Sequence, residues 1–409
     1  MLITGRVLTY AALSLSLSSL ACAGGDRGAP FALVAIDSLP SPAAPGSAEP
    51  NLHVARGNQV LLTWIEPQPD SAFALRLAAL EGDRWSSSRT ITRSESLFVN
   101  WADFPSVMTL PNGHLIAHWL QKSGAGKYAY NVRVARSLDS GTTWTRGSVL
   151  HTDRSEAEHG FVALWPESDS VAGAAWLDGR RSAGPQATMM LMSANTTGDT
   201  SWSERSVDTR VCDCCQTAAA LTARGPVVVY RDRSTAEIRD IAILRRVDGR
   251  WLEPKAVHDD GWHIEACPVN GPAVDASAER VAVAWFTAAR DTARVHVAFS
   301  SDAGATFGAP IRIDDGTPAG RVGIVLDAEG GAFVSWIERT GGENAEVRVR
   351  HVSVTGSLSD PVAVATSSAA RASGFPRMVR AGHALIFAWT APGSPSTVRV
   401  ARAKLDQSR

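Results

Sequence analysis

Short apolar runs that end in an aromatic residue recur along the chain at a nearly constant spacing. The seven runs end at Trp64, Trp119, Trp176, Tyr230, Trp285, Trp336 and Trp389. Successive aromatic residues lie 51 to 57 positions apart, a spacing found in several classes of repeat protein. The pattern therefore predicts seven similar units between residue 51 and the C-terminus.

A second kind of segment follows these runs and alternates apolar with polar residues. It is clearest at 132–136, 295–299, 347–351 and 398–402, and weaker at 75–77 and 241–243. Strict alternation is typical of a β-strand with one buried face. A turn and an aromatic residue come next, at Trp85, Trp144, Trp202, Trp251 and Phe307. Much of the surplus of tryptophan, 13 residues against 4 tyrosines, thus falls at two fixed places in one repeat, which indicates core packing and not a ligand site.

Each unit contains a short first strand, the run that ends in an aromatic residue, the alternating strand and an outer strand after the turn. Four antiparallel strands that pack only on neighbouring units form a propeller blade. Long stretches with apolar residues three and four positions apart are missing, so we expect little helix. The predicted fold class is all-β, with a seven-bladed β-propeller of four-stranded antiparallel blades over residues 51–409.

The seventh unit ends at its third strand and lacks an outer one. A short apolar segment at 31–36 would supply this strand, so that both ends of the chain close the ring and cover its open edge. The alternative is that 31–36 is linker, because residues 24–50 as a whole are rich in Gly, Pro, Ala and Ser and suit a tether.

Residues 1–23 have the pattern of an export signal, with one early charge at Arg6, an apolar run and small residues at its end. Two kinds of processing fit this end. Ser19 to Cys22 resembles a bacterial lipobox, which would make Cys22 a lipidated N-terminus; Ala21 and Ala23 would instead form an ordinary signal-peptidase site. We expect an exported periplasmic or cell-envelope lipoprotein; the alternative is a disordered N-terminus on a cytoplasmic protein.

The charge of the chain limits the classes of partner. A net charge of -1 gives no electrostatic reason to expect binding to nucleic acid or to an anionic membrane surface. We therefore expect no nucleic-acid partner, membrane attachment only through a lipid on Cys22, and a monomer.

Two turns after alternating strands carry the most specific motif in the sequence. One contains Ser137, Asp139, Gly141 and Trp144, and its second copy contains Ser300, Asp302, Gly304 and Phe307. We expect the aspartate to accept backbone N–H groups, the glycine to adopt a conformation that other residues resist, and the aromatic ring to hold the turn against the blade.

This motif resembles the Asp box, and the resemblance to the sialidase-like (BNR) propeller superfamily covers nearly all of the chain after the export signal. It implies a propeller, with a six-bladed sialidase-type ring as the alternative, and Asp boxes on the face opposite the active site. Sialidases use a Tyr nucleophile with a Glu partner, an Asp acid/base and three arginines. The usual Arg-Ile-Pro signature is missing here and Tyr230 falls at a packing position, so no catalytic residue carries over.

If the Asp boxes lie on one face, the loops after the aromatic-ending runs and those that lead into each first strand lie on the other. These loops supply the predicted ligand-binding residues: Asp103, His159, Asp178, Arg180, Arg231, Asp232, Arg233, His263 and Arg321. Such residues at loop ends are also often solvated or paired across blades.

The same loops hold all the cysteines that follow the export signal, namely Cys212, Cys214, Cys215 and Cys267. Their loops lead into neighbouring units, so we expect the thiols to meet at one rim. Disulfides are the default in an exported protein, and a bridge from Cys267 to the other loop would link two blades. Clustered thiolates would instead bind copper or zinc, and the third interpretation is a set of redox-active thiols.

Three functions therefore stay open. The first is an exported, non-catalytic propeller that binds a glycan or a protein through the loop face that carries the cysteines and arginines. The second is a sialidase-like glycoside hydrolase, with Asp103, Asp178 and Asp232 as candidate acids, since such enzymes use paired carboxylates. The third is a periplasmic protein that binds copper or zinc through its cysteines.

Overall fold

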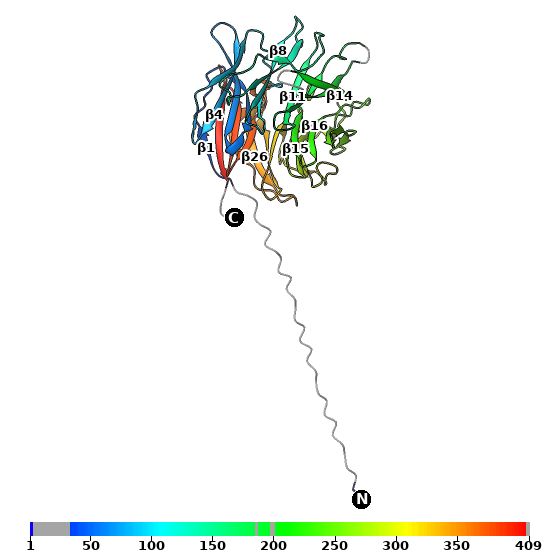
Figure 1. The fold of residues 1–409 in the computed structure, drawn as a ribbon. Helices are drawn as coiled ribbons and strands as arrows, with labels where there is room; N and C mark the ends of the chain where they lie inside the picture. The colour runs from blue at the N-terminus through cyan, green and yellow to red at the C-terminus, as the bar shows by residue number, and fades with distance from the viewer. Residues whose placement is uncertain (3–32, 185–186, 197–200, 406–409) are drawn as a thin grey trace.

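The computed structural model describes residues 1–2, 33–184, 187–196 and 201–405. The described residues form seven antiparallel sheets arranged as the blades of a β-propeller (Figure 1), so the ring has seven blades and not six. The predicted export signal beyond residue 2, Cys22 and the first part of the predicted tether lie outside these ranges. Within them, no helix has the length and apolar character needed to cross a membrane.

Each blade takes its strands from one continuous stretch of chain, except the last. Blade 1 contains β2 (Ala48–Val54), β3 (Val60–Pro67), β4 (Phe73–Glu81), β5 (Arg84–Trp85) and β6 (Arg89–Ser94). Blade 2 contains β7 (Ser106–Thr109), β8 (Leu115–Lys122), β9 (Tyr130–Ser137) and β10 (Ser148–Val149). Blade 3 contains β11 (His159–Pro166), β12 (Ala172–Asp178), β13 (Met189–Thr196) and β14 (Trp202–Val211).

The remaining blades follow the same order. Blade 4 contains β15 (Ala218–Thr222), β16 (Gly225–Arg231), β17 (Ile241–Val247), β18 (Arg250–Trp251) and β19 (Lys255–Ala256). Blade 5 contains β20 (Ala273–Ser277), β21 (Arg280–Thr287), β22 (Arg294–Ser300) and β23 (Ile311–Arg312). Blade 6 contains β24 (Pro318–Leu326), β25 (Ala332–Gly341), β26 (Asn344–Val352) and β27 (Val362–Ser368), and blade 7 contains β28 (Arg377–Ala381), β29 (Ala384–Ala391), β30 (Thr397–Leu405) and β1 (Leu33–Leu39).

The sequence periodicity matches these strands. Every run that ends in an aromatic residue lies in the second strand of a blade, and the alternating runs lie in the third. The aromatic ends are buried, including Tyr230 as expected, and they pack between neighbouring blades; Trp176, for example, lies in the core between blades 2 and 3. Among the residues that the structure describes, helix is limited to three single turns of 3-10 helix, at Arg56–Asn58, Ala289–Asp291 and Arg371–Ser373.

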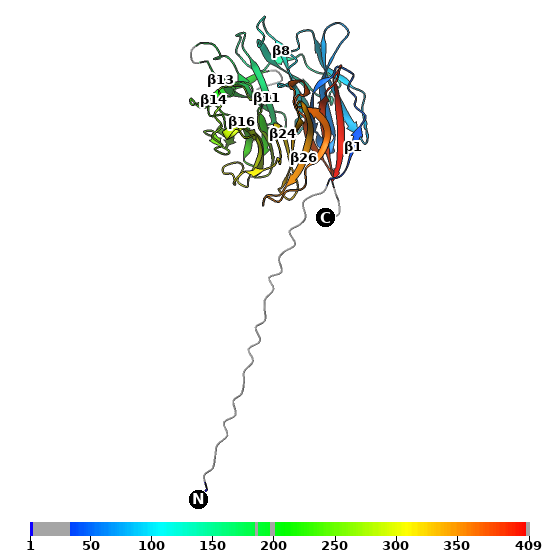
Figure 2. The same cartoon turned by 180° about the vertical axis from the view of Figure 1, so that it is seen from behind.

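The ring is closed by both ends of the described chain. Strand β1 pairs antiparallel with β30, from Leu39 opposite Val400 to Leu33 opposite Leu405. In both Figure 1 and Figure 2 the blue β1 lies beside the red C-terminal strand. The closing strand was expected at 31–36 and lies at Leu33–Leu39, where it covers the edge of β30 that a three-stranded last blade would leave open.

The two aspartate turns have the hydrogen bonds expected of them. Asp139 accepts the backbone N–H groups of Thr142 and Thr143 at 3.1 and 2.8 Å, and Asp302 accepts that of Thr306 at 2.9 Å. Gly141 and Gly304 have φ angles of 86° and 77°, where a side chain would be strained. Trp144 and Phe307 pack against the cores beneath the turns.

The loops that lead into the first strands of different blades contact one another. The side chain of Gln216, from the loop before β15, donates to the carbonyl of Ala102 at 2.6 Å and accepts from the N–H of Gly271 at 3.0 Å. Trp101 stacks on Phe375, with ring centroids 6.0 Å apart. These contacts connect blades 2, 4, 5 and 7 above a central cavity of about 360 Å³ that the first strands line.

Candidate functional site

The predicted ligand-binding residues and the four cysteines after the export signal lie at one end of the blades. In an antiparallel blade, the turn between strands three and four is on the same side as the turn between strands one and two. The loops between strands two and three and the loops between blades are on the opposite side. The face considered below is therefore the one opposite the Asp139 and Asp302 turns, and we call it the loop face.

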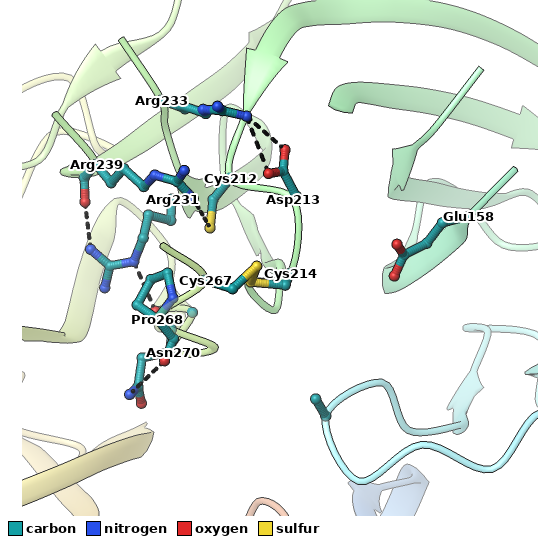
Figure 3. The surroundings of a disulfide bond; sticks show 12 residues. Glu158, Cys212, Asp213, Cys214, Arg231, Arg233, Arg239, Cys267, Pro268 and Asn270 are labelled. Atoms are coloured by element: carbon teal, nitrogen blue, oxygen red, sulfur yellow. Dashed lines mark hydrogen bonds and ion pairs between the residues drawn. A yellow bond between two sulfur atoms is a disulfide. The ribbon is translucent and has the colours of Figure 1, made fainter. Parts of the chain in front are cut away.

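The four cysteines meet on the loop face, as expected. Cys214 and Cys267 form a disulfide with their Cα atoms 6.1 Å apart, and it joins the loops before β15 and β20 (Figure 3). The predicted bridge between two blades is thus confirmed for this pair. Cys212 and Cys215 are free and buried, and the sulfur atoms of Cys212, Cys214 and Cys215 all lie within 4.8 Å of one another.

The free thiols lie in a cationic environment. The Nη1 atom of Arg239 is 3.6 Å from the Sγ atom of Cys212 (Figure 3), and the charge of Arg231 acts on both thiols. Burial by itself would raise the pKa of Cys212, but a hydrogen bond with Cys215, the backbone N–H of Cys214 and the two arginines together lower it to about 7. Burial raises the pKa of Cys215 well above its usual value. Cys212 is therefore the thiol that ionises first.

The cysteines fit a metal only in part. With Cys214 in a disulfide, Cys212 and Cys215 remain as thiolate ligands in this cluster, a pair that suits Cu(I) better than four-coordinate zinc. Asp153, His159 and Asp178 also come close enough together to share an ion. Both carboxylate oxygens of Asp178 are already hydrogen-bonded to Arg180, so this second group is a poor site.

Two of the predicted arginines serve as internal cross-links. Arg231 is 1% exposed and donates to the carbonyls of Asn270, Arg239 and Phe286 at 2.9, 2.6 and 2.6 Å. The guanidinium of Arg321 is likewise held by carbonyl oxygens of the loop 369–374. Since carbonyl oxygens already occupy these donors, neither arginine belongs to the site we propose below.

Arg233 lies nearer the surface in a chain of ion pairs. Its Nη1 atom is 3.1 Å from both carboxylate oxygens of Asp213 (Figure 3), and its Nη2 atom is 3.0 Å from Glu237. Glu237 also accepts from Arg239 at 2.9 Å and from Arg210 at 3.0 Å. This chain connects the half-exposed Asp213 to the arginine beside Cys212.

Asp178, Arg180 and His159 form a network that packs blade 3. Asp178 accepts from the indole N–H of Trp176 at 2.9 Å and from Arg180 at 2.7 and 2.8 Å. His159 is buried, stacks on His151 and lies 2.9 Å from Asp153. Other blades repeat the same contact between an indole and a carboxylate two residues later, with Trp64 bound to Glu66 and Trp336 to Glu338. This repetition marks the acids as structural partners of buried indoles.

Asp232 and His263 are two further predicted residues. Asp232 is half-buried; burial first, and then the charges of Asp208 and Asp240, raise its pKa to about 6. His263 is exposed, and its nearest acid is Glu265 at 3.9 Å.

Asp103 belongs to a buried cluster that the sequence alone did not reveal. Its carboxylate accepts the N–H of Phe161 at 2.8 Å and the hydroxyl of Tyr130 at 3.3 Å. The same hydroxyl donates to Glu158 at 2.6 Å. Tyr130 and Asp103 are buried, whereas Glu158 is half-exposed and faces the disulfide across the loop face (Figure 3).

The carboxyl groups of this cluster hold protons unusually tightly. Burial raises the pKa of Glu158 to about 7, and the nearby charge of Asp213 adds to the effect. Burial also raises the pKa of Asp103 well above its ordinary value. No sequence pattern singles out Tyr130 or Glu158, because they meet only when blades 2 and 3 pack together; the one available signal was that Glu158 directly precedes His159 in a loop of the predicted face.

The comparisons with known proteins concern the fold. No protein-family model matches the sequence, and no curated protein matches it. Among solved structures, an α-L-arabinanase from Penicillium chrysogenum has a TM-score of 0.49 at 13% identity, over 92% of this chain and 98% of that chain. The NanB sialidase from Streptococcus pneumoniae has a TM-score of 0.46 at 11% identity, over 92% of this chain and 70% of that chain. AofleA from Arthrobotrys oligospora has a TM-score of 0.48 at 10% identity, over 82% of this chain and 89% of that chain.

These identities are too low to carry a function from any of these proteins to this chain. The chain is a seven-bladed β-propeller.

Proposed function

We propose that this protein binds a glycan through its loop face, at a site centred on Glu158. The observation that carries the proposal is the Asp103–Tyr130–Glu158 cluster, which leaves one half-exposed carboxyl group protonated near neutral pH. A carboxylic acid in this state both donates and accepts hydrogen bonds, as a sugar hydroxyl does. Acids with such strongly shifted pKa values cluster at functional sites.

Neighbouring side chains supply the other contacts that a sugar needs. Asp213 lies near enough to Glu158 for its charge to act on it, and Arg233 pairs with Asp213, so a carboxylate and a guanidinium lie on the same face. The loop that carries Asp103 also carries the half-exposed Trp101, whose ring stacks on Phe375. Such a ring offers apolar surface against which the C–H face of a sugar can pack.

Hydrolysis of a glycoside is the second candidate, because two carboxyl groups share one tyrosine hydroxyl. Glu158 would be the acid, since a general acid needs a pKa near the working pH. Two features favour binding over this alternative. The hydroxyl of Tyr130 belongs to a fully buried side chain, and the arginines Arg231 and Arg321 are occupied by backbone carbonyls.

Glycan-array binding and a panel of fluorogenic glycosides test both functions with three variants. Glu158→Ala should weaken glycan binding at least tenfold, and Glu158→Gln should keep most of it, because an amide also donates and accepts. Glu156→Gln changes an exposed acid two residues away and serves as the matched control. Turnover by the wild type that Glu158→Gln abolishes would support the hydrolase instead. A folded protein that binds no glycan on the array and turns over no glycoside would refute both.

We also propose that the protein is exported and anchored through a lipid on Cys22. The support is the order of charge, apolar run and small residues over 1–23. Cells that express the protein are labelled with a radioactive fatty acid, with Cys22→Ala as the control. Label in the wild type alone supports the anchor, and an unlabelled protein in the cytoplasmic fraction would refute export.

A further inference from the structure

The structure assigns the four clustered cysteines to a relay that exchanges a dithiol for a disulfide. In this relay Cys212 is the nucleophile, Cys214 carries the sulfur atom that is attacked, Cys267 is the leaving group and Cys215 completes the exchange. The relay is independent of glycan binding, and no other residue takes part in its covalent steps.

The arrangement of the sulfur atoms is what exchange requires. The free Cys212 and Cys215 lie within 4.8 Å of Cys214, which is itself bonded to Cys267. Both free thiols are buried, whereas Cys214 is half-buried and Cys267 is exposed. A buried dithiol therefore lies directly against a disulfide that solvent reaches.

The exchange balances without any external reagent. The Cys212 thiolate attacks the Sγ atom of Cys214, so that a Cys212–Cys214 bond forms and the bond to Cys267 breaks, with its electron pair leaving on Cys267. The Cys215 thiolate then attacks Cys212 and displaces the thiolate of Cys214. One disulfide has replaced another, and the two protons lost by Cys212 and Cys215 end on Cys267 and Cys214.

The surroundings determine the direction of attack. Arg239 lies 3.6 Å from the sulfur of Cys212, and the charge of Arg231 also favours its thiolate, which is the reactive form. Cys267 is exposed, so water stabilises its thiolate as it leaves. Cys215 is the later nucleophile, because its own ionisation is suppressed while Cys212 is charged.

The exchange has a structural consequence. A disulfide between Cys212 and Cys215 lies within one loop, so the covalent link between blades 4 and 5 is lost. The thiols of Cys214 and Cys267 are then at the surface, within reach of external disulfides. The exchange thereby transfers the disulfide bond from the surface pair to the buried pair and leaves a reactive dithiol at the surface.

Alkylation of the folded protein tests the relay. Metal is first removed with a chelator, and iodoacetamide is then added without denaturant, followed by peptide mapping of labelled cysteines. In the wild type, Cys267 should become labelled with time even though it starts in a disulfide. Cys212→Ser should reduce this labelling at least tenfold, and Cys215→Ser should accumulate a Cys212–Cys214 disulfide together with labelled Cys267.

Several outcomes would overturn the relay. They are an unlabelled Cys267 in the wild type, equal labelling of Cys267 in the folded Cys212→Ser variant, and stoichiometric copper or zinc on Cys212 and Cys215 of the purified protein. Protein isolated with both pairs oxidised is first reduced with one equivalent of dithiothreitol. After this partial reduction, the relay requires that some molecules keep the Cys214–Cys267 disulfide and that others keep the Cys212–Cys215 disulfide. Reduction confined to Cys214 and Cys267 would also overturn the relay. Circular dichroism verifies that each variant is folded.

Discussion

Replacing Arg231 with methionine distinguishes an internal cross-link from a ligand-binding arginine. Methionine fills a similar volume without charge or donors. The change leaves the carbonyls of Asn270, Arg239 and Phe286 without their donor, in a place where the replaced side chain is only 1% exposed. It also removes the contact of the guanidinium with the ring of Trp262, whose centroid is 4.7 Å away.

The size of the effect follows from these contacts. A buried carbonyl that loses its partner costs about 1–3 kcal/mol. Removing the buried charge recovers part of this loss, because the charge no longer has to be desolvated. We therefore expect Arg231→Met to lower the free energy of unfolding by about 4 kcal/mol in total.

Urea unfolding followed by tryptophan fluorescence measures this change as a lower midpoint at an unchanged slope. Arg233→Met is the matched control, since it removes an arginine two residues further along the chain whose ion pairs are partly exposed, and it should change the free energy of unfolding by less than about 1 kcal/mol. If Arg231→Met unfolds within about 1 kcal/mol of the wild type but abolishes glycan binding, Arg231 is a ligand contact and our assignment is wrong.

Four further changes have defined outcomes. Replacing both Cys214 and Cys267 with serine should destabilise the protein by up to about 4 kcal/mol, given their separation of 53 residues, and a thermal melt of the wild type in excess reductant should match. Asp139→Ala should lower the melting temperature and leave glycan binding intact. Backbone and side-chain hydrogen bonds from Thr143 hold the pKa of Asp139 at about 2, so the stability that this carboxylate gives the wild type is lost as pH falls from 3.8 through 2. A variant whose stability falls with acid just as that of the wild type does would contradict this. Burial raises the pKa of Glu158 from 4.5 to about 7, so the native state binds the extra proton and the free energy of unfolding falls as pH rises between these values. In urea titrations, Glu158→Gln should reduce the difference in this free energy between pH 5 and pH 8 by about 1–2 kcal/mol. The same difference in the variant and the wild type would refute this. The rate at which Cys267 becomes labelled should rise with pH around 7, since Cys215, Arg231 and Arg239 surround the Cys212 thiol, and a rate that stays flat from pH 6 to pH 8 would exclude Cys212 as the nucleophile.

The periodic positions were enough to predict the ring. The packing of Trp64 or Trp285 between neighbouring blades depends on local alternation and on a repeat length, and both are visible along a single chain. The turns at Asp139 and Asp302 were predictable for the same reason, because each is held by hydrogen bonds within a few residues. The meeting of the four cysteines followed from placing their loops at equivalent points of adjacent units.

What each charged side chain does was decided by the tertiary structure alone. Arg231 is the last residue of β16 and Arg233 follows two residues later, yet one is enclosed by carbonyls from blades 4 and 5 and the other pairs with half-exposed acids. Asp178 was predicted to face a ligand, and it is instead the partner of Trp176 and Arg180. Tyr130 and Glu158 meet only because blade 2 packs on blade 3. The sequence by itself determined which segments become strands, because that depends on local spacing. Burial and pairing depend on neighbours distant along the chain, and only the closed ring brings these together.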